Sequence, residues 1–264
     1  MEQPNQNIKL VSNKNSRVIL PNILTLFGVC IGLSSIKFAF DGNFELAIIA
    51  VIIAGIIDGL DGRIARLIKA TSKVGKELDS LTDVISFGVA PAFIMYFWSL
   101  VEIGRLGWLV SLIYVVCVAL RLARFNVNTG GEPSWKDNFF EGIPSPAGGI
   151  LVLTPLVYSL SEIQIFEPNY QILVPSLFVV TSILLISKVP TYSLKRIAVP
   201  RKTTIFLLFA VVLFFGFLFI YTFNTIVIAS TVYLLFVPIS AFHYYSTSKI
   251  KKLDEEIDHN EDVL

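Results

Sequence analysis

The chain has 264 residues, of which 54% are hydrophobic and 16% are charged, and its mean hydropathy is +0.71. Because soluble domains carry about 25% charged residues, this composition excludes an ordinary soluble fold and indicates lipid as the main solvent. The net charge of +1 identifies no partner by itself. No nucleic-acid-binding motif occurs in the sequence, so no nucleic-acid partner is expected.

Residues 1–20 are expected to form a solvated arm that ends in an interfacial segment. Eight apolar runs follow, and each approaches the roughly 20 residues that a membrane-crossing helix needs. Runs of this length are too long for barrel strands, and lipid-exposed backbone must satisfy its own hydrogen bonds. The predicted fold is therefore an all-α polytopic membrane protein. The runs lie near 21–40, 43–66, 75–100, 106–126, 144–161, 170–188, 203–222 and 225–244. Residues 247–264 carry mixed charges and are expected to be a cytoplasmic tail.

Basic residues are distributed unevenly between the two sides of this predicted bundle. Apart from Lys37 and Arg105, the lysines and arginines fall on the side that the N-terminus shares. The positive-inside rule then predicts that both termini and the 67–74, 127–143 and 189–202 loops are cytoplasmic. The expected localisation is the cell membrane, with any active site facing the cytoplasm.

Four aspartates occur inside the second and third runs. Asp58 and Asp61 lie three residues apart, and Asp79 and Asp83 lie four apart, so each pair shares one helix face. Counted from the helix ends near 66 and 75, at about 1.5 Å per residue, the two pairs reach matching depths. An antiparallel hairpin would therefore gather all four carboxylates. Ionisable groups within a span cost about 2.5–3.5 kcal/mol each and mark candidate functional sites.

Such a cluster of carboxylates needs charge compensation. Two unit charges about 4 Å apart repel by about 4 kcal/mol at an effective dielectric constant of 20. Either some of the carboxyls are protonated or cations lie among them. Oxygen ligands suit hard divalent ions, so Mg²⁺ or Mn²⁺ is expected. Arg66 would add a fixed positive charge at the mouth of the site, an arrangement that suits phosphate transfer.

Glycines occur beside the aspartates and in the first run. Gly62 and Gly75 would leave the backbone uncovered where a bulky anion approaches, although close helix packing also favours glycine in membranes. Gly28 and Gly32 form a small-residue pair that could pack within the chain or between chains.

The acidic run resembles the signature motif of the CDP-alcohol phosphatidyltransferases at every specified position: Asp58-x2-Asp61-Gly62-x2-Ala65-Arg66-x8-Gly75-x3-Asp79-x3-Asp83. The resemblance implies a core of six spans, here residues 21–200, followed by two additional helices at 201–246. It also implies a homodimer with a site for two divalent cations, Mg²⁺ or Mn²⁺, open to the cytoplasm. The family cleaves a CDP-linked lipid when an alcohol attacks the lipid-side phosphorus and CMP leaves.

The same resemblance implies roles for individual residues. Asp58, Asp61 and Asp79 would be metal ligands, and Asp83 would lie at the metal site and act as general base on the incoming hydroxyl.

A second set of residues would hold the CDP-lipid. Gly62, Arg66 and Ser72 would contact its CDP portion. Asn22 and Thr25 match a Pro-Asn-x-x-Thr element that holds the nucleotide phosphates in this family. On its own this element is a weak signal, since prolines are common at helix starts.

Four further segments, 78–88, 121–126, 142–148 and 187–191, look like the phosphatidylserine synthase branch of the family. That likeness implies CDP-diacylglycerol and L-serine as substrates and phosphatidylserine as product. The resemblance covers residues 18–195 well, and the last two runs contribute only generic apolar sequence.

Serine is a zwitterion, so its site needs a cation for the carboxylate and oxygens for the ammonium. Arg121 and Arg124 share a helix face at the cytoplasmic end of the fourth run, and Asn126, Glu141 and Ser145 lie close in sequence. These five are the candidate serine-binding residues. The alternative for the arginines is anchoring at the membrane surface with snorkelling side chains.

Other functions remain open at this point. Glycerol 3-phosphate or an inositol phosphate could be the acceptor, although an extra phosphate should require more basic residues at the site. An ion-coupled transporter would also bury carboxylates, but such sites usually lie near the midplane between repeated halves. Here the cluster is unrepeated and close to one surface.

Overall fold

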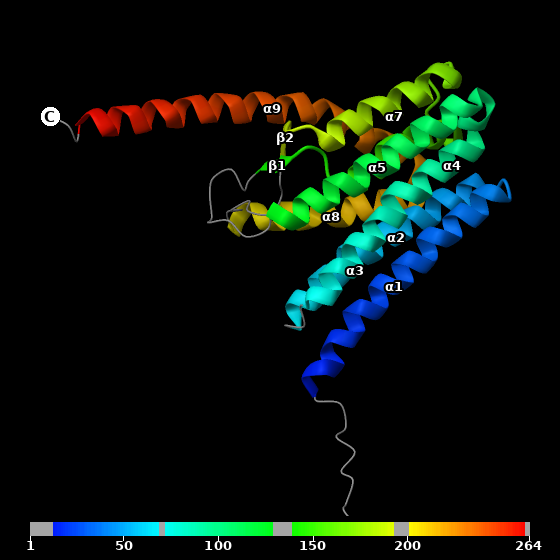
Figure 1. Ribbon diagram of the computed structural model, residues 1–264, viewed down its shortest axis with the longest axis horizontal. Helices are drawn as coiled ribbons and strands as arrows, with labels where there is room; N and C mark the ends of the chain where they lie inside the picture. Colours follow the sequence, from blue (N-terminus) through cyan, green and yellow to red (C-terminus); the bar gives the residue numbers. More distant parts are fainter. Residues whose placement is uncertain (1–12, 69–71, 129–138, 193–200, 262–264) are drawn as a thin grey trace, which may run out of the picture.

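The computed structural model describes residues 13–68, 72–128, 139–192 and 201–261, and these form a bundle of long helices (Figure 1). Each apolar run predicted above coincides with helical structure. The α-helices are α1 (Asn13–Phe40), α2 (Phe44–Leu67), α3 (Lys73–Asp83), α4 (Ala90–Trp98), α5 (Arg105–Asn128), α6 (Ser145–Leu160), α7 (Tyr170–Ile186), α8 (Arg201–Ile220) and α9 (Thr222–Glu261). A π-helical turn, η1 (Val84–Val89), joins α3 to α4, and a 3₁₀ turn, η2 (Leu100–Ile103), precedes α5.

Four helical segments are long and apolar enough to cross a bilayer: Ile19–Phe40, Val74–Trp98, Arg105–Val127 and Thr222–Thr247. Helix α2 is of similar length, but it carries several charged side chains, whereas α6, α7 and the apolar part of α8 are shorter. The protein is therefore a multi-pass helical membrane protein, and the number of eight spans stays a prediction. Large apolar side chains of α8 are exposed along its length, as lipid-facing surface requires.

Helix α1 packs along α2 and also contacts α3, η1 and α4. Small residues permit this approach. A Cβ on Gly28 would lie 3.5 Å from the Thr82 side chain, and a Cβ on Gly32 would lie 3.3 Å from the Cα of Ser86. The glycine pair therefore packs α1 against α3 and η1 of the same chain.

The helix ends differ from the prediction at both ends of the chain. Helix α1 begins at Asn13, so Pro21 lies inside it rather than at its start. A proline within a membrane helix is tolerated when neighbouring groups satisfy the freed backbone. Helix α9 continues to Glu261, through the segment expected to be a separate tail, and extends well beyond the rest of the bundle (Figure 1).

A small antiparallel sheet joins two loops that the sequence did not predict to be paired. Strand β1 (Phe139–Glu141) pairs with β2 (Pro190–Tyr192), so the segment before α6 is tied to the segment after α7. Gly142 follows β1 with φ +72°, and its N–H donates to the Val189 carbonyl at 2.9 Å. The Thr191 hydroxyl donates to the Gly142 carbonyl at 2.7 Å. These contacts fix the chain just before Ser145, the first residue of α6.

Candidate metal and catalytic site

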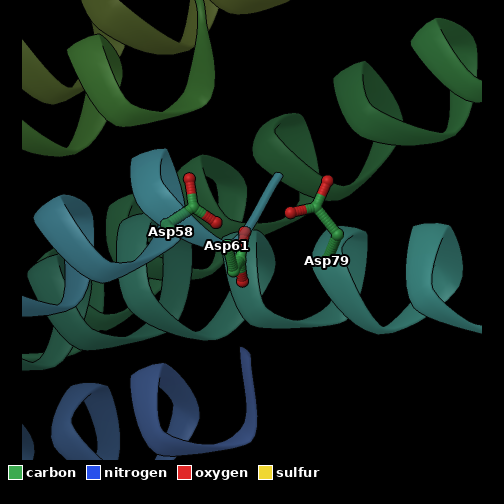
Figure 2. A group of neighbouring side chains, drawn as sticks. All are labelled: Asp58, Asp61 and Asp79. Atoms are coloured by element: carbon green, nitrogen blue, oxygen red, sulfur yellow. The ribbon is translucent and has the colours of Figure 1, made fainter. Parts of the chain in front are cut away.

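Three of the four aspartates form one cluster between α2 and α3. One carboxylate oxygen each from Asp58, Asp61 and Asp79 lies within 4.8 Å of the others. Figure 2 shows the side chains of Asp58 and Asp61, from α2, beside that of Asp79, from α3. The predicted hairpin geometry is thus confirmed for these three residues. Asp83 lies one turn further along α3, where its carboxylate interacts with that of Asp58.

The cluster has the chemistry of a divalent-cation site. Asp58 Oδ1, Asp61 Oδ1 and Asp83 Oδ1 are buried, and no hydrogen-bond partner for them is found among the described residues. Buried carboxylate oxygens without donors are costly, and a hard cation is the partner that several converging carboxylates accept best. The residues present therefore fit a bound Mg²⁺ or Mn²⁺.

The cluster opens into a cleft of about 510 Å³ at the end of the α1–α2–α3 group. Its walls contain all five residues that the sequence predicted for CDP-lipid binding. The cleft is lined by Pro21, Asn22, Thr25, Asp61, Gly62, Ala65, Arg66, Ser72, Gly75, Lys76 and Asp79. The cleft contains both carboxylates and basic side chains. Carboxylates can bind a cation that in turn binds phosphate, and basic side chains can bind phosphate directly, so the cleft suits a ligand with phosphate groups.

Local structure explains how the cleft is held open. The buried Thr25 hydroxyl donates to Asp61 Oδ2 at 2.5 Å, which links α1 to the acidic cluster. Ser72 caps α3, since its side chain accepts the Gly75 N–H at 2.9 Å. A Cβ on Gly62 would meet no atom of the described residues within 4 Å, so this glycine leaves open space among them in the cleft wall. A Cβ on Gly75 would lie 3.0 Å from Asn22 Oδ1, so that glycine also allows close packing.

A hydrogen-bonded chain connects Asp83 to Arg121. The Ser145 hydroxyl donates to Asp83 Oδ2 at 3.0 Å, and Arg121 Nη1 donates to the Ser145 oxygen at 3.2 Å. Ser145 is fully buried and Arg121 is 8% exposed, and no described residue accepts a hydrogen bond from Arg121 Nε. Ser145 therefore holds Asp83 Oδ2, while Asp83 Oδ1 accepts no hydrogen bond from the described residues.

The remaining candidate serine-binding residues lie apart from this chain of hydrogen bonds. Arg124 Nη1 donates to the Ile186 carbonyl at 2.7 Å, at the C-terminal end of α7. Asn126 donates to the Ser80 hydroxyl at 2.8 Å. Glu141 is exposed at the end of β1. Although Arg121 and Arg124 lie three residues apart, their side chains therefore contact different parts of the protein.

The sequence analysis missed two features of the site. Lys76 lines the cleft, and its position inside the acidic motif was the available signal. The π-helical turn η1 begins directly after Asp83, and the Tyr114 hydroxyl donates to the Phe87 carbonyl within it at 2.7 Å. Such turns recur at functional sites, but the residues Val84–Val89 carry no pattern that separates a π-turn from an α-helix.

The fold and site together define a multi-pass helical membrane protein with an acidic centre beside a basic-lined cleft. Residues 18–184 match the CDP-alcohol phosphatidyltransferase family. The chain belongs to that family.

Curated relatives refine the comparison. A CDP-diacylglycerol–serine O-phosphatidyltransferase of Mycobacterium leprae is 40% identical over 185 residues, 69% of this chain and 61% of the relative. One of Helicobacter pylori is 35% identical over 222 residues, 84% of this chain and 90% of the relative. An archaetidylserine synthase of Methanothermobacter thermautotrophicus is 38% identical over 142 residues, 52% of this chain and 57% of the relative. The chain thus spans about six-tenths of the length of the mycobacterial relative.

Proposed function

We propose that the protein transfers the phosphatidyl group of CDP-diacylglycerol to the hydroxyl of L-serine, with release of CMP and formation of phosphatidylserine. The observation that carries the proposal is the acidic cluster at the end of the phosphate-suited cleft, with Asp83 and Arg121 linked through Ser145 beside it. The names of the bacterial relatives support serine as the acceptor.

Asp58, Asp61 and Asp79 are the proposed ligands of the cations, with Asp83 at the edge of the same centre. Two ions, Mg²⁺ or Mn²⁺, are proposed. When bound, they would neutralise charge on the pyrophosphate and on the departing phosphate oxygen.

The protein's own groups position the reactants and move the proton. Asn22, Thr25, Gly62, Arg66 and Ser72 hold the CDP portion in the cleft, and the Arg66 guanidinium offsets charge on the leaving CMP.

Asp83 acts as general base. As the serine oxygen forms its bond to the lipid-side phosphorus, the proton passes to Asp83 Oδ1, which accepts no hydrogen bond from the residues that the structure describes. The bond between that phosphorus and the CMP oxygen breaks. Ser145 keeps the other carboxylate oxygen fixed, so Oδ1 stays aimed at the acceptor.

For the acceptor, Arg121 is proposed to bind the serine carboxylate, because its buried Nε has no partner within the part of the chain that the structure describes, and its Nη1 already contacts Ser145. Arg124, Asn126 and Glu141 stay candidates for weaker contacts at the rim.

The domain arrangement is proposed as in the sequence analysis. A catalytic core at 21–200 follows the 1–20 arm, and two additional C-terminal helices occupy 201–246 before the tail at 247–264. The unequal distribution of basic residues supports cytoplasmic termini, a cell-membrane location and an active site that faces the cytoplasm. A homodimer is proposed from family likeness.

The deciding experiment measures CMP release by purified protein from CDP-diacylglycerol with Mg²⁺ or Mn²⁺, with one acceptor offered at a time. Release that depends on L-serine, together with phosphatidylserine formation, supports the proposal. Release with glycerol 3-phosphate or an inositol phosphate instead keeps the reaction class and overturns the acceptor. An absence of release with every acceptor, in folded and metal-loaded protein, overturns the catalytic proposal.

The role of Asp83 is tested by Asp83→Asn. We expect turnover to be lost while CDP-diacylglycerol binding is retained, because the amide cannot accept the proton. Loss of binding in parallel with loss of rate would instead identify Asp83 chiefly as a metal ligand.

A further inference from the structure

Phe87, in the middle of the π-helical turn η1, packs against three other helices. Its ring lies against α2, where a Cβ on Gly55 would be 3.3 Å from the ring, and Gly55 is one turn before Asp58. Its backbone lies against α6, where a Cβ on Gly149 would be 3.1 Å from the Phe87 carbonyl oxygen. The same carbonyl accepts the hydroxyl of Tyr114, on α5, at 2.7 Å. The turn is thus held from three sides.

The sequence explains why the Phe87 carbonyl takes a donor from another helix. In a regular α-helix, the carbonyl of residue 87 would accept the N–H of residue 91. Pro91 occupies that position at the start of α4; a proline has no N–H, and its ring crowds the carbonyl four residues before it. The helix widens here, since the Ala90 N–H donates to the Ile85 carbonyl five residues back. The Tyr114 hydroxyl, which is fully buried, supplies the hydrogen bond that the proline cannot.

The turn joins the acidic helix α3 to the packed helix α4. Helix α3 carries Asp79 and ends at Asp83, directly before η1, whereas Ala90 and other residues of α4 lie in the core. The position of the α3 carboxylates beside α2 therefore depends on the conformation of η1. Cation ligands must be held within about 0.5 Å of the productive geometry, so a small change in this turn affects the centre.

We propose that Tyr114 is a positioning residue of the acidic centre: by donating to the Phe87 carbonyl, its hydroxyl holds η1 in the π-helical form that brings Asp79 to the two carboxylates of α2. This inference rests on the proposed function, in which these carboxylates bind Mg²⁺ or Mn²⁺. Tyr114 lies outside the acidic signature motif and acts on the centre only through η1. Loss of its hydroxyl should lower the affinity for the cation and leave the acceptor site intact.

The test compares Tyr114→Phe with Tyr158→Phe in the purified full-length protein. Tyr114→Phe keeps the buried ring and its edge contact with Phe178, so the core stays filled. The Tyr158 hydroxyl also donates to a phenylalanine carbonyl, that of Phe166, at 2.9 Å, but at the far end of α6 from Ser145. Each variant therefore loses a tyrosine–carbonyl hydrogen bond, and only that of Tyr114 lies at η1.

Binding of Mn²⁺ is measured directly, from the electron paramagnetic resonance signal of the free ion during titration without substrates. For Tyr114→Phe we expect the Kd for Mn²⁺ to rise about 5- to 10-fold, the equivalent of one hydrogen bond. The Mn²⁺ concentration for half-maximal CMP release should rise by the same factor, while the KM for L-serine at saturating Mn²⁺ stays unchanged. Tyr158→Phe should bind Mn²⁺ as the parent protein does, even if its melting temperature falls as far.

A lower melting temperature of Tyr114→Phe with unchanged Mn²⁺ affinity would reduce the hydrogen bond to a structural contact and overturn the inference. An equal loss of affinity in Tyr158→Phe would overturn it too, and both results leave the proposed function intact. Should Tyr114→Phe not unfold cooperatively, Pro91→Ala decides, because its new N–H competes for the Phe87 carbonyl. Mn²⁺ affinity should then fall again, and unchanged affinity overturns the inference. Absence of Mn²⁺ binding by the parent protein overturns both this inference and the proposed metal site.

Discussion

Replacement of Ser145 by alanine tests the hydrogen-bonded chain at the centre of the site. The substitution removes one donor to Asp83 Oδ2 and one acceptor from Arg121 Nη1, and the residue is fully buried. A hydrogen bond to a charged group contributes about 1.5–3 kcal/mol. Because Asp83 is also held by its own helix, we expect the lower part of that range in the transition state. This corresponds to a kcat about 10- to 30-fold lower, since each 1.4 kcal/mol is about tenfold.

The assay is steady-state CMP release with both substrates varied, combined with thermal unfolding in detergent. The loss should appear in kcat, with the KM for CDP-diacylglycerol unchanged, because Ser145 is not part of the cleft that suits the nucleotide. Ser111→Ala is the matched control. Ser111 is also buried, but its hydroxyl donates to the Gly107 carbonyl of its own helix. A change of less than twofold at Ser145, or an equal loss at Ser111, would refute the positioning role.

Three further outcomes are expected. Gly62→Ala should raise the KM for CDP-diacylglycerol about 10-fold without lowering the melting temperature, because the new methyl enters the cleft. Gly59→Ala is the control: Gly59 also has room for a methyl but does not line the cleft, so neither the KM nor the melting temperature should change. Gly142→Ala should destabilise the protein by about 2–4 kcal/mol in thermal unfolding, since its Cβ would lie 2.8–2.9 Å from three carbonyl oxygens at a positive φ. Gly104→Ala, with positive φ and open space, should lose only about 1–2 kcal/mol, and equal losses would contradict the steric account. Chelation of divalent ions should abolish serine-dependent CMP release, and added Mg²⁺ or Mn²⁺ should restore it. Undiminished activity in the presence of chelator would contradict the proposed metal site.

Much of the fold and site could be predicted because the membrane restricts the backbone to a few solutions. Apolar runs of sufficient length had to be helices, and carboxylates three or four residues apart had to share a face. The gathering of Asp58, Asp61 and Asp79 followed from counting residues to the ends of two antiparallel helices. Nothing in that reasoning needed long-range information.

What could not be predicted depends on contacts between distant segments. Arg121 and Arg124 are three residues apart, so the same rule predicts that they share a helix face. Nevertheless, the Arg121 guanidinium contacts Ser145, whereas that of Arg124 contacts the end of α7. The choice depends on where α6 begins and where α7 ends, which periodicity does not report. The β1–β2 pairing likewise joins segments that lie far apart in the sequence, since Phe139 pairs with Tyr192.

The π-helical turn after Asp83 determines how the continuous segment formed by α3, η1 and α4 would respond to the deletion of a residue. A π-turn accommodates one residue more than an α-helical turn, and each residue of an α-helix rotates the following side chains by about 100°. Phe87, inside the turn, is packed closely by Gly149 of α6, so the second half of the segment is anchored in the core. Deletion of a single residue in the turn would restore regular helix and rotate Asp79 and Asp83 together away from α2. The extra residue in the π-turn thus sets the direction in which the α3 carboxylates point, while η1 and α4 keep their place in the bundle.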